Sequence, residues 1–208
     1  MGCVSIVDTP QCKIHFLMEG SIAMASSVFN GYEAPRYQEH DALITQIVAA
    51  FNADKATFCG ATADQAAQIT DLTEDLVKAW IIQETGGGDA ASLAGWAVDP
   101  AQVNNPGDWS EWKPSAGLTQ PQTRNSGDIE TNLKAAVIWL ARKGFGTSGQ
   151  PPANRPTGTF DGWPTALRRY NGNVTPVGDL EHRDIYAQRV VQRESEPRTC
   201  CPIEIMNA

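Results

Sequence analysis

Glu84 stands in the last turn of a predicted helix, in the stretch LVKAWIIQETGGG (residues 76–88). A helix carries partial negative charge at its C-terminal end, so a carboxylate there is destabilised. At about 100° per residue, Glu84 projects between Val77 and Trp80, opposite the charged arc that contains Lys78. Desolvation and the helix terminus both raise the pKa of such a carboxyl group. The position predicts a general acid, and the alternative is a glutamate that turns out to solvent where the helix frays.

The elements that position this glutamate are predicted to be helices, with little sign of strands. Asp71 and Glu74 form a capping-box-like start for the helix described above. Gly144 ends a later helix, Pro164 stands at a first helical position, and Asp179 caps the last helix. The predicted helices lie within residues 36–55, 61–69, 71–84, 128–144, 163–170 and 179–193.

Composition restricts the class of protein. The 208 residues suit one domain with extensions, and 41% hydrophobic residues is enough for a sizeable core. The net charge of -8 argues against nucleic acid or an anionic membrane as a partner, because both bind basic surfaces. No run approaches the roughly 20 apolar residues that cross a bilayer. We expect an N-terminal extension over residues 1–35, a catalytic domain over 36–193 and a C-terminal tail over 194–208.

Five cysteines lie outside the middle of the chain, without the spacing or the histidine cluster of a zinc site. We expect no metal and no cofactor. The cysteines suit disulfides that tie extensions to a core, with one left over; the alternative is free thiols in a reducing compartment. They are Cys3, Cys12, Cys59, Cys200 and Cys201.

Five motifs occur in an order that resembles the lysozyme-like superfamily, specifically goose-type lysozymes and soluble lytic transglycosylases. The motifs are LVKAWIIQETGG, AGLTQPQT, DIETNLKAAVIWLARKGF, WPTALRRYNGN and HRDIYAQRVV. They span roughly residues 71–192. The family's corresponding patterns are a helix-ending glutamate in an ESG setting, GLMQ, an asparagine-containing helix, a YN pair and a closing helix with Tyr and Val. The resemblance implies a mainly α, lysozyme-like fold with a long active-site loop.

Carried over by position, the resemblance makes Glu84 the acid that protonates the glycosidic oxygen between N-acetylmuramic acid and N-acetylglucosamine. Thr85 replaces the family's serine and keeps a hydroxyl that can bond a sugar. Arg169 stands where a small residue is common, which changes the adjacent subsite. The other substrate-binding positions that the resemblance implies are Gly117, Leu118, Gln120, Tyr170 and Asn171. Tyr170 could equally be a core aromatic, and Gln120 a turn residue bonded to backbone.

Inverting glycoside hydrolysis also needs a second carboxylate as base, with room for a water molecule between the two acids. The loop over residues 86–125 offers four acids, and the resemblance to goose-type lysozymes makes Asp99 and Asp108 the best candidates. Each could instead be a solvated loop charge. Lytic transglycosylases need no base, because the muramyl hydroxyl attacks its own anomeric carbon. The loop tryptophans Trp96, Trp109 and Trp112 could stack on sugars or fix the loop to the core.

The function expected from these residues is a peptidoglycan muramidase, either a lysozyme or a lytic transglycosylase. The alternatives are a non-catalytic glycan- or inhibitor-binding module on the same fold and a structural part of the cell envelope. The N-terminus shows no conventional export signal, although peptidoglycan lies outside the cytoplasm. We therefore expect delivery to the periplasm of a target bacterium by a non-Sec route, as for a type VI secretion effector; a phage endolysin is the alternative. An effector would need a periplasmic immunity protein as partner.

Overall fold

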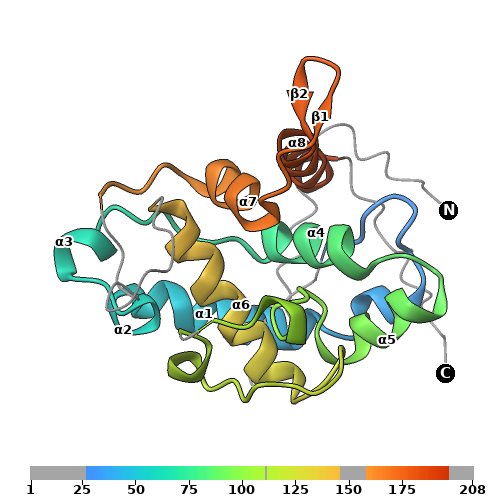
Figure 1. Cartoon of the computed structure of the whole chain (residues 1–208), viewed down its shortest axis with the longest axis horizontal. Coiled ribbons are helices and arrows are strands. Elements are labelled where there is room, and N and C mark those ends of the chain that lie inside the picture. The colour runs from blue at the N-terminus through green and yellow to red at the C-terminus, as the bar shows by residue number, and fades with distance from the viewer. Residues whose placement is uncertain (1–26, 111, 146–157, 197–208) are drawn as a thin grey trace, which may run out of the picture.

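The computed structural model describes residues 27–110, 112–145 and 158–196, and it is mainly helical, as predicted (Figure 1). The α-helices are α1 (Asp41–Ala53), α2 (Lys55–Cys59), α3 (Ala63–Ala66), α4 (Glu74–Thr85), α5 (Ala90–Val98), α6 (Ile129–Gly144), α7 (Trp163–Asn171) and α8 (His182–Ser195). Short 3-10 helices are η1 (Pro35–Gln38), η2 (Pro106–Asp108) and η3 (Lys113–Ala116). Strands β1 (Pro176–Val177) and β2 (Leu180–Glu181) form an antiparallel hairpin between α7 and α8 that projects from the body.

Helix α4 is the central element of the fold. Every residue from Leu76 to Ile82 is buried, because α1, α5 and α8 all pack against this helix (Figure 1). A helix that is apolar nearly all round is stable only inside a domain. The C-terminal end of α4, which carries Glu84, therefore has a fixed position.

Lys78, on the charged arc of α4, is buried rather than solvated. Its side chain is 3% exposed, and its ammonium lies 2.8 Å from Oδ1 of Asp41 on α1. The same ammonium donates to the carbonyl oxygen of Ser27 at 2.8 Å. Phe29, which falls within the predicted N-terminal extension, is fully buried in the core. The charged position on α4 thus fastens the segment before α1 to the central helix.

Two helix starts differ from the prediction. Thr73, not Asp71, caps α4, and its hydroxyl accepts the backbone N–H of Leu76 at 3.0 Å. Helix α8 begins after Glu181, which forms a reciprocal capping box with the third residue of the helix. Asp179 lies instead in the turn of the hairpin. In both places a second capping residue lies two positions further along the chain. Its side chain accepts a hydrogen bond from the first turn of the helix, where the backbone N–H groups have no acceptor within the helix.

The loop over residues 86–125 contains α5, η2 and η3 and is fastened to the core by tryptophans. Trp96 and Trp112 are 3% and 1% exposed. The indole N–H of Trp96 donates to the carbonyl of Arg36 at 3.0 Å. Trp112 stacks on Trp139 of α6 with ring centroids 4.4 Å apart. These two tryptophans fix the loop and present no free face to a sugar.

Cys59 is a buried free thiol at the end of α2, and burial raises its pKa to about 12. The other four cysteines lie outside the described residues, so the disulfide prediction stays a prediction.

Candidate active site

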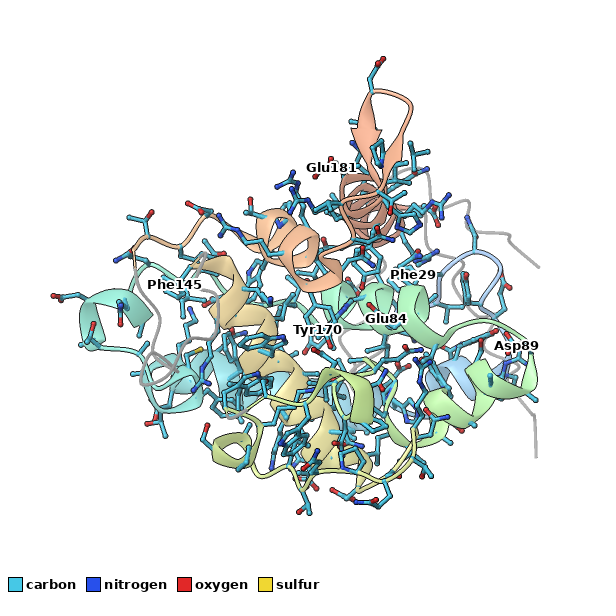
Figure 2. The ribbon with its side chains drawn as sticks, viewed as in Figure 1. Phe29, Glu84, Asp89, Phe145, Tyr170 and Glu181 are labelled. Atoms are coloured by element: carbon cyan, nitrogen blue, oxygen red, sulfur yellow. The ribbon has the colours of Figure 1, made fainter. Side chains whose placement is uncertain are left out.

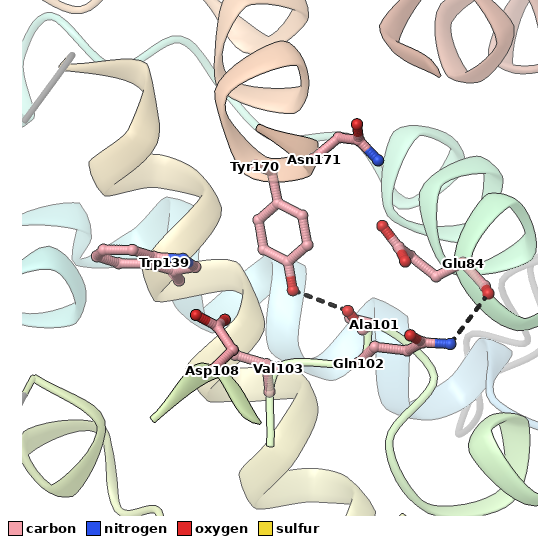
Figure 3. A pocket seen from close by; sticks show the side chains of 8 residues that line it. All are labelled: Glu84, Ala101, Gln102, Val103, Asp108, Trp139, Tyr170 and Asn171. Atoms are coloured by element: carbon pink, nitrogen blue, oxygen red, sulfur yellow. Dashed lines mark hydrogen bonds between the residues drawn. The ribbon is translucent and has the colours of Figure 1, made fainter. Parts of the chain in front are cut away.

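Glu84 lies at the C-terminal end of α4 and faces a pocket near the centre of the molecule (Figures 2 and 3). Its side chain is half-buried. Tyr186 of α8, itself buried, donates its hydroxyl hydrogen to Oε1 of Glu84. The pocket is lined by Glu84, Ala101, Gln102, Val103, Asp108, Trp139, Tyr170 and Asn171. It therefore joins α4, α6 and α7 with the loop that follows α5.

The environment of Glu84 favours the protonated form. The pKa of Glu84 is raised from 4.5 to about 7: burial is the main cause, the hydrogen bond from Tyr186 opposes the rise, and the negative charge of Asp99 adds to it. A carboxyl group with such a pKa carries its proton in about half of the molecules at neutral pH. It can then donate that proton to a leaving group in the pocket.

One wall of the pocket is formed by Ala101, Gln102 and Val103. The hydroxyl of Tyr170 donates to the carbonyl of Ala101 at 2.8 Å, and the amide of Gln102 donates to the carbonyl of Glu84 at 3.3 Å (Figure 3). Gln102 has a φ of 55°, a left-handed conformation that is uncommon outside glycine. The wall is thus tied to both α7 and the end of α4.

Asp99 is buried behind this wall and does not line the pocket. It is 2% exposed and follows the last residue of α5. Its Oδ1 accepts the backbone N–H of Val103 at 3.0 Å, and its Oδ2 accepts that of Asn104 at 2.8 Å. Burial raises the pKa of Asp99, while these two hydrogen bonds oppose the rise. Both oxygens hold the backbone of the wall.

Asp108 is the second carboxylate that lines the pocket with Glu84 (Figure 3). Its side chain is 78% exposed and lies 3.6 Å from the ammonium of the buried Lys113. Lys113 also donates to the main-chain carbonyl of Asp108. The structure therefore presents Asp108 to solvent and to the pocket, unlike Asp99.

Thr85 is 1% exposed and is not presented to the pocket. Its hydroxyl donates to the carbonyl of Pro100 at 2.8 Å, so the hydroxyl fastens α4 to the segment after α5. Three further predicted site residues line a second pocket, which shares no lining residue with the first. These are Gly117, Leu118 and Gln120. The predicted set is thus divided, with Glu84, Asp108, Tyr170 and Asn171 in one pocket.

Tyr170 has both of the roles considered for it. Its ring packs edge-on against Trp80 in the core, at 4.8 Å between centroids. Its hydroxyl end lines the pocket and bonds Ala101. Burial and the nearby carboxylates keep the pKa of this hydroxyl well above its ordinary value, so it stays a neutral donor.

The sequence did not identify Tyr186 or four of the residues that line the pocket, which are Ala101, Gln102, Val103 and Trp139. Tyr186 belongs to the closing-helix motif, but no function was predicted for it. A lone tyrosine on an amphipathic helix was the pattern that could have identified it. No sequence pattern marked Trp139 or Gln102 as a site residue, because neither periodicity nor spacing shows which loop and helix positions meet at the pocket. No group of three or more metal-ligating side chains occurs among the described residues, and no described helix is long and apolar enough to span a membrane.

No family model, curated protein or solved structure matches this chain.

Proposed function

We propose that this protein is a peptidoglycan muramidase with a lysozyme-like fold, which cleaves the bond from N-acetylmuramic acid to N-acetylglucosamine. The observation that carries the proposal is Glu84, a half-buried carboxyl group with a pKa of about 7 that faces a pocket. A structural glutamate has no need of this environment. Perturbed carboxyl groups in clefts are typical of general acids.

In the proposed reaction, Glu84 protonates the glycosidic oxygen as the bond to the anomeric carbon breaks. Tyr186 donates to Oε1, so the proton of the neutral acid resides on Oε2. The hydrogen bond also fixes the rotamer of Glu84. Tyr170 stays neutral and braces the wall opposite, which keeps the acid aligned with the scissile bond.

The second step depends on what attacks the anomeric carbon. Asp108 lines the same pocket and is open to solvent, so it is our candidate for a base that activates water. Asp99 is less suited to this role, because both of its oxygens accept backbone N–H groups. If the enzyme is a lytic transglycosylase, the muramyl hydroxyl attacks and Glu84 itself accepts the proton.

Mass spectrometry of peptidoglycan digested with the purified chain tests the proposal. A reducing end identifies a hydrolase, and a 1,6-anhydro end identifies a transglycosylase. Glu84→Gln should abolish either product while keeping the fold, because an amide cannot supply the proton. Asp108→Asn should lower turnover by about 10² only in the hydrolase case. Binding of glycan without any cleavage by the wild type would support a non-catalytic module instead.

Delivery to a competing bacterium is part of the proposal. The pocket holds two carboxylates in a chain of net charge -8, so an immunity protein that blocks it should present a basic segment. Expression of the chain in the periplasm of a sensitive host should stop growth, and the product of the adjacent gene should restore it. Harmless expression, or failure of rescue, would favour a phage endolysin or a housekeeping enzyme.

A further inference from the structure

Lys143 differs from the other lysines of the described structure. Each of the other four has a carboxylate within 4.0 Å; these four are Lys55, Lys78, Lys113 and Lys134. Among the described residues, Lys143 forms no such ion pair, although it is half-buried. The sequence that follows, residues 146–157, contains no acidic side chain. A partly desolvated ammonium without a carboxylate is costly unless something else compensates its charge.

An indole ring provides part of that compensation. The ammonium of Lys143 lies 4.6 Å from the ring centroid of Trp139, one helical turn earlier on α6. The same ring stacks on Trp112, with planes 10° apart, so the indole beside the ammonium is held in place. A cation over an indole is stabilised by the ring quadrupole, but the ring supplies no hydrogen-bond acceptor. Within the described ranges, no acceptor takes a hydrogen bond from this ammonium, so its donors can serve a ligand.

Trp139 connects Lys143 to the pocket. Its indole is seen edge-on in Figure 3, at the side of the pocket away from Glu84, with Asp108 below it. Burial lowers the pKa of Lys143, and the charge of Asp108 opposes that change, so the ammonium lies within electrostatic reach of the pocket. The guanidinium of Arg169 is nearby but is held by Asp161 at 2.7 Å. Among the residues that the structure describes near this end of the pocket, Lys143 is therefore a cation without a carboxylate partner.

We propose that Lys143 and Trp139 form an anion subsite that binds a carboxylate of the peptide carried by the glycan. This inference rests on the proposed function and names its substrate class more closely: a peptide-bearing strand rather than a bare one. Peptides attached to the muramyl lactyl group carry free carboxylates. In an acidic protein whose pocket contains Glu84 and Asp108, a cation beside Trp139 selects where such a carboxylate can lie.

Turnover on two matched substrates tests the subsite. One is peptidoglycan strands with their peptides, and the other is the same strands after an amidase has removed the peptides. We expect the wild type to prefer the peptide-bearing strand, and Lys143→Met to reduce that preference in kcat/KM by about tenfold, mainly through KM. Methionine keeps an apolar stem on the indole. Lys143→Arg should retain most of the preference, and so should Lys134→Met on the same helix.

A binding measurement separates this inference from the proposed function. Glu84→Gln would be titrated calorimetrically with a soluble muramyl peptide and with the same peptide after its carboxylates are amidated. We expect about tenfold weaker binding of the amidated peptide, and no such difference once Lys143→Met is added. If Glu84→Gln binds the peptide through its carboxylates but the wild type cleaves no peptidoglycan, the enzyme proposal is wrong and the subsite proposal stands. If the wild type cleaves peptidoglycan but Glu84→Gln binds both peptides with equal affinity, the subsite proposal is wrong and the enzyme proposal stands. An unchanged substrate preference in Lys143→Met would lead to the same conclusion.

Discussion

The ionisation of Glu84 is set by opposing effects of its neighbours. Burial raises its pKa to about 7, and the Tyr186 hydroxyl lowers it by bonding the carboxylate. In the proposed reaction the protonated form of Glu84 is the acid, so activity should fall as pH rises through about 7. Tyr186→Phe removes the bond, so the pKa should rise and the alkaline limb of kcat/KM should move to higher pH. The pH dependence of kcat/KM in the wild type and in Tyr186→Phe checks this. An alkaline limb at the same pH in both would mean that Tyr186 does not lower the pKa of Glu84.

The raised pKa of Glu84 also makes folding depend on pH. Its folded pKa exceeds the unfolded value, so the favourable contribution of the neutral acid is complete below about pH 4.5 and is lost as pH rises through about 7. Glu84→Gln cannot ionise and should be more stable than the wild type at pH 9, by roughly 1–3 kcal/mol. Denaturant unfolding at pH 5 and pH 9 measures the difference. Equal stabilities at pH 9 would mean that the carboxylate is well solvated.

At this scale, the sequence predicted the unusual residue but not its surroundings. Glu84 could be recognised because a helix end and an apolar face are both local patterns. Its hydrogen-bond partner is 102 residues away, on a helix that reaches it only through tertiary packing. Thr85 was expected to face a sugar, yet its hydroxyl bonds Pro100. Neighbours along a helix point in different directions, and packing decides which of them meets the pocket.

Among the elements, the segment that forms the pocket wall depends most on one side chain, that of Asp99. Asp99 accepts the backbone N–H groups of Val103, in the wall, and of Asn104, directly after it, and Asp99→Asn would place an amide NH₂ against one of them. We expect a loss of about 1–3 kcal/mol in unfolding free energy. The charge that raises the pKa of Glu84 also disappears, so the alkaline limb should move to lower pH, opposite to Tyr186→Phe.

Asp89 at the other end of α5 provides the matched control. It is exposed and caps the helix through the N–H groups of Ala91 and Ser92. Asparagine is an equally good N-cap, so Asp89→Asn should leave stability and the pH profile nearly unchanged. If both variants behave alike, Asp99 has no special role in holding the wall.

Most helices were predictable, whereas their exact starts were not. The apolar periodicity in residues 36–55 and 128–144 corresponds to α1 and α6, which the structure confirms. The starts of α4 and α8 were each placed two residues early, because several capping side chains occur in succession and only the three-dimensional entry of the chain selects one. The burial of Lys78 could not be predicted, because its ion-pair partner Asp41 lies on another helix.

For the whole molecule, the contact between Lys78 and Asp41 holds the N-terminal part of the domain on the central helix. Asp41 is 13% exposed, and replacing it with alanine removes the carboxylate that lies 2.8 Å from the buried ammonium of Lys78. We expect Asp41→Ala to cost about 3–5 kcal/mol. Asp71→Ala breaks the Lys55 pair, in which the carboxylate is 78% exposed, and should cost less than about 1 kcal/mol. Urea unfolding of the two variants compares their losses in unfolding free energy directly. Similar losses would contradict a special role for the contact between Lys78 and Asp41.

The left-handed backbone at Gln102 has a consequence for how the protein would respond to laboratory evolution. A non-glycine residue with a φ of 55° stores conformational energy, and here it does so in the pocket wall. Glycine would relieve that energy but remove the amide that reaches Glu84. A library selected for heat resistance alone should therefore enrich Gln102→Gly, and the survivors should have lost turnover. Sequencing such a library and measuring the turnover of the survivors would show whether the strained backbone of this wall lowers thermal stability in favour of activity.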